Sequence, residues 1–233
     1  MTTRADTGLR RFVGGRSQAA EASTAQPNPA EQQPEPERCE LCDTPVDSRH
    51  GHVVDREHQR LMCTCRACYL LFTHERSTSP DGADAQPAVR YRAVPDRYLH
   101  DPERQLTQAD WERLQVPVGA AFFIRGVGDR PVAGFYPSPA GATECLLDLA
   151  AWSELGERHP LLNAAEAEVE AILIRRSESG IDCFLVPVDA CYELVGAMRL
   201  LWRGFDGGAE ARTRIDEFFD TVRTRARPFA AGS

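Results

Sequence analysis

Four cysteines in two closely spaced pairs limit what the N-terminal third of this chain can fold into. Cys39 and Cys42 form one C-x-x-C pair, and Cys65 and Cys68 form a second, with 22 residues between the pairs. Each pair bends the backbone so that both thiolates face one ion, and two pairs at this separation are typical of a tetrahedral metal site. A segment of this size buries too little apolar surface to fold without such a cross-link. The sequence therefore predicts that Cys39, Cys42, Cys65 and Cys68 bind one metal ion.

Zinc is the metal that we expect, because two C-x-x-C pairs at this separation are the strong form of the zinc signal. Four thiolates leave no coordination position open for catalysis. The same ligands suit a rubredoxin-like iron site, since spacing does not distinguish iron from zinc. A thioredoxin-type redox couple fits less well, because it needs one pair in a βαβ context. Cys63 alternates with Cys65 along one strand, so it is either a substitute ligand or a free thiol. His50, His52 and His58 can replace or support a ligand, although a polar hairpin surface accounts for them more simply.

The segment between the cysteine pairs has the pattern of a β-hairpin. The stretches "HGHVV" and "RLMCT" can pair as strands around the polar turn "DREHQ". After Cys68, "YLLFTHER" has apolar spacing compatible with a helix. Knuckle, hairpin and helix in this order predict a treble-clef or zinc-ribbon-like module over residues 39–76.

The sequence predicts a disordered arm before the cysteine-rich module and a linker after it. Residues 1–38 lack apolar periodicity and are rich in Pro, Glu and Gln towards their end, which predicts a disordered N-terminal arm. Its basic and apolar stretch "GLRRFVGG" is either without a role or a docking motif. Residues 77–118 begin as a turn-rich linker, followed by a short strand at "VRYRAVP" and a short helix capped by Thr107 and ended by Pro117.

Residues 119–228 contain a weak internal repeat, and 229–233 are expected to be a tail. Residues 121–153 and 171–203 align without a gap, with "AFFIR" matching "AILIR" and Trp152 matching Trp202. Each half reads as two strands and a helix, the helices being "ATECLLDLAAWSEL" and "CYELVGAMRLLW", and "EARTRIDEFFDTVRTRA" is a further amphipathic helix. We therefore expect an α+β fold with a duplicated hairpin-plus-helix domain, a mostly antiparallel sheet and helices packed on one face.

Composition narrows the function classes. The net charge of -8 offers no footprint for nucleic acid, and all 27 basic residues are arginine, which excludes a Walker A loop and a lysine nucleophile. No apolar run is as long as a membrane span, and no secretory signal is visible, so we expect a cytoplasmic protein with reduced cysteines.

Cys145, Cys183 and Cys191 lie in apolar segments and are expected to be buried small hydrophobes. We find no catalytic constellation and expect that the protein is not an enzyme.

Several motifs together resemble a known family. "CELC", "CRACYLLF", "RYRAVPDR", "YPSPAGATE", "VPVDACYELVG" and "LLWRGFDGG" resemble the actinobacterial DUF5947 family over about residues 39–228, and "GLRRFV" resembles the start of its members. The resemblance implies the ligand positions Cys39, Cys42, Cys65 and Cys68, and no catalytic residue. It also implies an association with a high-affinity [NiFe] uptake hydrogenase, beside whose genes family members tend to be encoded.

Three functions follow as expectations. The first is a non-enzymatic accessory or assembly factor that presents a zinc-stabilised surface to a protein partner, for example a hydrogenase subunit or maturation factor. The second is an electron carrier in which the same four cysteines hold iron. The third is an enzyme or a small-molecule binder that uses a cleft between the two half-repeats.

Overall fold

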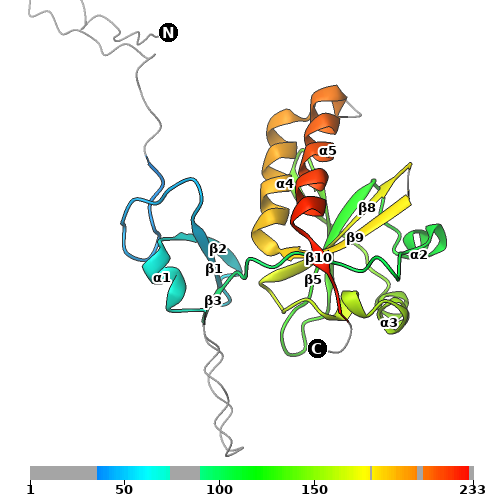
Figure 1. The fold of residues 1–233 in the computed structure, drawn as a ribbon, viewed down its shortest axis with the longest axis horizontal. Helices are drawn as coiled ribbons and strands as arrows, with labels where there is room; N and C mark the ends of the chain where they lie inside the picture. Colours follow the sequence, from blue (N-terminus) through cyan, green and yellow to red (C-terminus); the bar gives the residue numbers. More distant parts are fainter. Residues whose placement is uncertain (1–35, 74–89, 179, 204–206, 231–233) are drawn as a thin grey trace, which may run out of the picture. The chain divides into compact units, whose positions relative to one another are not determined.

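A computed structural model describes residues 36–73, 90–178, 180–203 and 207–230 of the chain (Figure 1). Residues 1–35 of the predicted arm, which include "GLRRFV", and residues 77–89 of the predicted linker lie outside these residues. Within them, no helix has both the length and the apolar character that a bilayer span requires.

The cysteine-rich segment forms a small antiparallel sheet. Its strands are β1 (Gly51–Asp55), β2 (Arg60–Thr64) and β3 (Tyr91–Ala93), in the order β2-β1-β3, and α1 (Arg66–Leu70) follows β2. The predicted hairpin is confirmed, with His52 opposite Cys63 and Asp55 opposite Arg60. The helix after Cys65 is shorter than the apolar pattern of "YLLFTHER" indicated, because α1 ends at Leu70.

The rest of the chain builds a seven-stranded sheet of order β10-β4-β9-β8-β5-β6-β7. Every pairing is antiparallel except that of β10 with β4. The strands are β4 (Leu99–His100), β5 (Ala120–Ile124), β6 (Ala133–Ser138), β7 (Gly141–Cys145), β8 (Glu170–Ser177), β9 (Gly180–Pro187) and β10 (Arg227–Pro228). The helices are α2 (Gln108–Arg113), α3 (Leu149–Arg158), the 3-10 turn η2 (Pro160–Asn163), α4 (Val188–Leu201) and α5 (Gly208–Arg225). The predicted α+β class with a mostly antiparallel sheet is confirmed.

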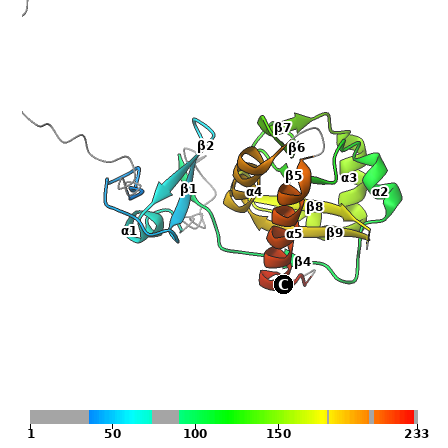
Figure 2. The same cartoon turned by 90° about the horizontal axis from the view of Figure 1, so that it is seen from above.

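Helices cover both faces of this sheet (Figures 1 and 2). On one face, Phe123 and Ile172 pack with Trp152 of α3 and with residues of α2 and η2. On the other face, Phe122 and Leu173 pack with residues of α4 and α5. The expectation that all helices pack on one face is therefore wrong. The strands alternate between two apolar faces, so each face needs its own cover.

The structure does not confirm the duplication. The ungapped alignment pairs Phe122 with Ile172, but these side chains lie on opposite faces of the sheet. The residue that pairs with Phe122 across β5 and β8, and shares its face, is Leu173. Ile172 precedes Leu173 by one residue and therefore points to the opposite face, because side chains alternate along a strand. The helices of the two halves, α3 and α4, also lie on opposite faces.

The first half contains a strand where we expected a helix. Residues 142–145 belong to β7, which pairs with β6 through a turn at Pro139 and Ala140. Gly141 has φ +121°, a backbone conformation that glycine adopts readily. Helix α3 begins only at Leu149, where the Asp148 carboxylate accepts hydrogen bonds from two backbone amides. The predicted helix thus loses its first seven residues to a hairpin and a loop.

The predicted linker contributes to both sheets. Strand β3 extends the hairpin by pairing with β1, and β4 pairs with β9. Helix α2 begins at the predicted cap, where Thr107 and Asp110 form a reciprocal capping box.

At the C-terminus, the predicted amphipathic helix is confirmed as α5 (Gly208–Arg225). The Phe229 amide, in the predicted tail, donates to the His100 carbonyl at 2.7 Å.

A mixed apolar and ionic junction joins the two sheets. Val54 and Val94 pack with Val169 and Val188, all of them at most 7% exposed. Ion pairs join Arg56 to Glu168 (2.5 Å) and Arg92 to Glu166 (2.7 Å). The junction combines apolar burial with paired charges, which favours a defined position of the small sheet against the large one.

Candidate metal centre

The first cysteine pair lies on a tight turn before β1. The Cys39 amide donates to the Thr44 carbonyl and the Asp43 amide donates to the Cys39 carbonyl, both at 2.8 Å. Asp43 has φ +61°, in the left-handed region that Asp tolerates better than most residues. This knuckle brings Cys39 and Cys42 to the same side of the turn, as the C-x-x-C spacing predicted.

The second pair lies at the start of α1. Cys65 is the N-cap, and its sulfur accepts a hydrogen bond from the Cys68 amide at 3.5 Å. Tyr69 joins the helix to the segment after β3, because its hydroxyl donates to the Val94 carbonyl at 2.8 Å. A Cβ added at Gly51 would stand 2.5 Å from the Tyr69 ring, so glycine is required for this close packing. The hairpin and the helix cap together position the second pair.

The four sulfur atoms converge. All four lie within 4.8 Å of one another, and the sulfurs of Cys42 and Cys65 are 3.6 Å apart. A tetrahedral ion with metal–sulfur bonds of about 2.3 Å places its sulfur ligands about 3.8 Å apart. All eight cysteines are free thiols. The spacing, the all-sulfur donor set and the N–H···S hydrogen bond fit a tetrathiolate metal ion.

The thiols of this cluster differ in acidity. Hydrogen bonds from the Thr44 hydroxyl and amide, followed by those from neighbouring thiols, lower the pKa of Cys42 to about 6. Burial, together with hydrogen bonds among the thiols, raises the pKa of Cys68 to about 12. A metal ion must displace the proton that Cys68 retains, so metal binding to the cluster weakens as the pH falls. When bound, such an ion supplies a cross-link between the knuckle and the helix.

Cys63 is separate from the four-cysteine cluster. It lies opposite His52 on the hairpin, and its amide donates to the Glu40 carboxylate at 2.9 Å. Burial, with the negative charges of Glu37 and Glu40, raises the pKa of this thiol. Cys63 is therefore not one of the four clustered cysteines.

The remaining cysteines belong to the large sheet and its cover. Cys191 is fully buried in α4, whereas Cys183 on β9 and Cys145 on β7 are partly buried. Burial raises the pKa of Cys183 to about 12, so this thiol stays protonated. The expectation that these cysteines are buried is confirmed for Cys191, whereas Cys183 and Cys145 are only partly buried.

The histidines of the hairpin divide into two groups. His58 lies near the Asp55 carboxylate (3.0 Å), which Arg90 also binds (2.8 Å). His50 and His52 lie together, with ring centroids 4.8 Å apart. Sequence reasoning missed Asp189, whose carboxylate is 2.8 Å from His52 Nδ1 although 137 residues separate them. No local signal identifies that partner, because it comes from the start of α4.

Comparison with known protein families decides the relationship of this chain. The family model described as "Family of unknown function (DUF5947)" matches residues 38–226. The chain belongs to the DUF5947 family. The DUF5947 match includes all four clustered cysteines, the hairpin and both helical layers of the large sheet. Neither the search of curated proteins nor the search of solved structures finds a match.

Proposed function

We propose that this protein is a non-enzymatic accessory factor whose four cysteines hold a structural zinc ion. The observation that carries the proposal is the convergence of four sulfurs from a knuckle and a helix start. Four thiolates occupy all four coordination positions of a tetrahedral zinc ion, so the metal cross-links the chain and has no open position for a substrate. In this account the fold is a treble-clef-like module, zinc-stabilised, beside an α+β domain.

A second argument is the small size of the module's core. Among the module's described residues, few apolar side chains are buried: Cys39, Val53, Val54 and Met62. A core of this size stabilises a fold weakly, so a metal cross-link supplies what apolar burial does not. Stabilisation is thus the simplest role for the ion.

The module also presents an apolar surface beside the metal ligands. Leu70 is 46% exposed and Leu71 is 73% exposed, immediately after Cys68. Adjacent exposed leucines at the C-terminal end of α1 are a candidate contact for a protein partner. By its family resemblance, we propose a subunit or maturation factor of a [NiFe] uptake hydrogenase as that partner, in the cytoplasm.

The partner is tested by expressing the tagged chain together with the subunits and maturation factors of a [NiFe] uptake hydrogenase. A defined complex with one of them, weakened by Leu71→Ser and retained by the matched variant Leu200→Ser on α4, supports the proposal. Leu200 is also 73% exposed but lies in another element. The absence of a complex with each of these proteins contradicts the hydrogenase assignment.

Iron in the same four-cysteine site is the second candidate. The N–H···S hydrogen bond from the Cys68 amide to Cys65 also suits an iron–thiolate centre, in which such bonds tune the potential. An iron centre would be coloured and redox-active, whereas zinc would be colourless. Metal analysis with an absorbance spectrum distinguishes the two candidates.

A further inference from the structure

A second group of metal-binding side chains lies on the hairpin. His50 precedes β1, while His52 and Cys63 are cross-strand partners and therefore share a face. Each of the three offers a ligand atom, and the three atoms lie within 4.8 Å of one another. None of the three belongs to the four-cysteine cluster.

His50 carries an unsatisfied nitrogen. Its side chain is only 9% exposed, and Nδ1 is 2.7 Å from the Asp47 carbonyl oxygen. A carbonyl oxygen only accepts, so Nδ1 carries the hydrogen and Nε2 presents a lone pair. Nε2 is buried and has no hydrogen-bond partner among the described residues. A buried acceptor without a partner costs free energy, which a bound cation would recover.

His52 is oriented by a carboxylate. Its Nδ1 is 2.8 Å from Asp189 Oδ2, in the first turn of α4. Histidines that bind metals usually donate their other N–H to a carboxylate or a carbonyl oxygen, which sets the tautomer and the ring orientation. Here His50 has the carbonyl and His52 has the carboxylate. A simple ion pair accounts for His52 and Asp189 but leaves the buried His50 Nε2 unexplained.

The donor atoms indicate the class of ion. Two imidazole nitrogens and one thiolate suit borderline first-row transition metals, whereas Mg²⁺ and Ca²⁺ require oxygen ligands. We propose that His50, His52 and Cys63 form a second site for a divalent transition-metal ion such as Zn²⁺ or Co²⁺. Cys63 gives up its thiol proton to solvent when the metal–sulfur bond forms.

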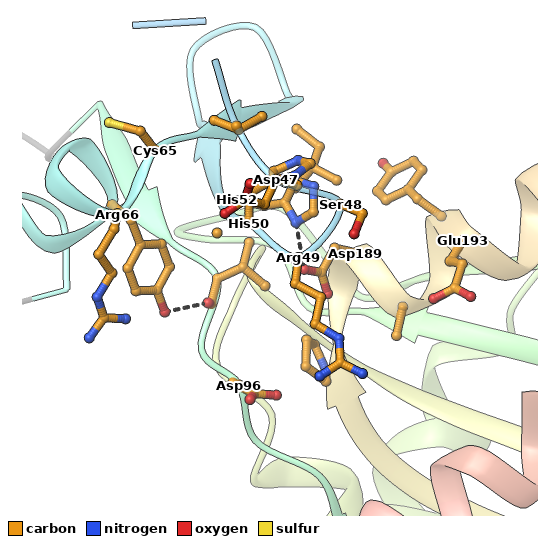
Figure 3. Close-up of a pocket in the computed structure, with 18 of the residues that line it drawn as sticks. Asp47, Ser48, Arg49, His50, His52, Cys65, Arg66, Asp96, Asp189 and Glu193 are labelled. Carbon is orange, nitrogen blue, oxygen red and sulfur yellow. Dashed lines mark hydrogen bonds and ion pairs between the residues drawn. The ribbon is translucent and has the colours of Figure 1, made fainter. Parts of the chain in front are cut away.

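This second site differs from the first in having three protein ligands. Three ligands leave one position of a tetrahedral ion for water or an exogenous ligand. His50 and His52 line a cavity of about 1030 Å³ that Arg49 and Asp189 also line (Figure 3). Two of the three proposed ligands therefore border a cavity, whereas Cys63 does not line it.

Cobalt titration of the full-length chain, with zinc already in the four-cysteine site, tests the proposal. We expect one equivalent of Co²⁺ to bind without releasing zinc, with a thiolate-to-cobalt charge-transfer band. Cys63→Ser should abolish that band, and His50→Ala should weaken Co²⁺ binding at least about tenfold. The control His58→Ala should bind Co²⁺ as the unmodified chain does, because His58 belongs to the Asp55 group.

Three results would overturn the second site: no saturable Co²⁺ binding, a charge-transfer band that persists in Cys63→Ser, or release of zinc in proportion to the Co²⁺ bound. Zinc content distinguishes loss of the site from unfolding, because a folded Cys63→Ser module keeps its zinc. Asp189→Asn provides a second variant outside the module. As a positioning residue, Asp189 should weaken Co²⁺ binding about 10-fold to 100-fold when substituted, with the charge-transfer band retained at saturation.

Discussion

At the scale of single residues, environment separates cysteines that look equivalent in the sequence. Cys65 converges with three other sulfurs, Cys63 lies two residues away beside histidines, and Cys183 is part of the large sheet. The spacing of the two C-x-x-C pairs was enough to predict the first group, because the knuckle and the helix cap are local structures. It could not predict the Asp189 contact to His52, because that contact depends on how the two sheets pack.

Replacing a clustered cysteine should remove the metal. We expect Cys65→Ser to lower the metal held by the four-cysteine site from about one ion per chain to near zero and to destabilise the hairpin. Cys183→Ser should leave metal content unchanged. Metal analysis after dialysis against a weak chelator, which empties the three-ligand site, measures both. Unchanged metal in Cys65→Ser would make the ligand assignment wrong.

The buried carboxylate of Glu170 should be the most sensitive charged group at the junction. It is 0% exposed and accepts hydrogen bonds from Arg97 Nε (2.8 Å) and Nη2 (2.5 Å). Glu170→Gln removes charge-assisted hydrogen bonds at a buried position, while the Arg97 side chain stays 39% exposed to water. We therefore expect a loss of about 2 kcal/mol in the free energy of unfolding.

The matched control for Glu170 is Glu154→Gln, because Glu154 pairs with Arg113 on an exposed surface. Exposed pairs contribute little, so we expect a change below about 1 kcal/mol. Denaturant unfolding of both variants measures the difference. Equal effects would show that burial does not set the strength of the Glu170 pair.

Asp110 should give the chain a specific acid sensitivity. Burial alone would raise its pKa, but hydrogen bonds from Arg158 and Thr107 outweigh burial and lower the pKa to about 2. A lowered carboxylate pKa stabilises the fold above the unfolded value of about 3.9, and the stabilisation, about 2 kcal/mol, is lost as the pH falls to about 2. Asp110→Asn should therefore flatten the stability curve between these pH values. A curve parallel to that of the unmodified chain would contradict this role.

At the scale of elements, local signals predicted local structures. The hairpin β1–β2, the cap of α2 and the amphipathic helix α5 all formed where turn residues, a capping box and helical periodicity indicated. Strand β7 was missed because Ala142, Thr143 and Glu144 do not by themselves favour a strand over a helix. Pairing with β6 decides their conformation. The turn "SPAG" was the signal that could have identified this hairpin.

The capping box of α2 should contribute measurably to stability. The Thr107 hydroxyl accepts from the Asp110 amide, and the Asp110 carboxylate accepts from the Thr107 amide. Thr107→Ala should lower the free energy of unfolding by about 1 kcal/mol. Thr221→Ala is the control, because Thr221 lies inside α5 on its exposed face and caps no helix. Thermal unfolding measures both variants, and equal losses of stability in Thr107→Ala and Thr221→Ala would contradict a stabilising role of the cap.

At the scale of the whole molecule, two sheets with different sources of stability meet at one junction. The large sheet has an extensive apolar core on each face, whereas the module has few buried apolar side chains and a set of four sulfurs. The small sheet is connected to the large sheet by apolar contacts of Val54 and Val94 and by the ion pair of Arg97 with Glu170. No sequence pattern indicated these contacts. This division implies that metal removal affects the two parts unequally.

Chelation should therefore unfold the module before the large sheet. Removing the metal with a strong chelator should raise amide hydrogen exchange in β1 and β2 toward unfolded rates, while β5 and β8 retain their protection. Exchange measured by mass spectrometry reports both sheets in one sample, so the large sheet serves as the internal control. Unchanged protection in β1 and β2 would mean that the metal does not support the module.

Metal content with an absorbance spectrum, on untagged full-length chain purified without air and dialysed against a weak chelator, tests the central claim most directly. A structural zinc site predicts about one zinc ion per chain, no visible absorption, and loss of that zinc in Cys65→Ser. Iron with thiolate charge-transfer bands would contradict the zinc assignment and make the four cysteines an electron-transfer centre. A colourless chain without metal would contradict a metal site altogether.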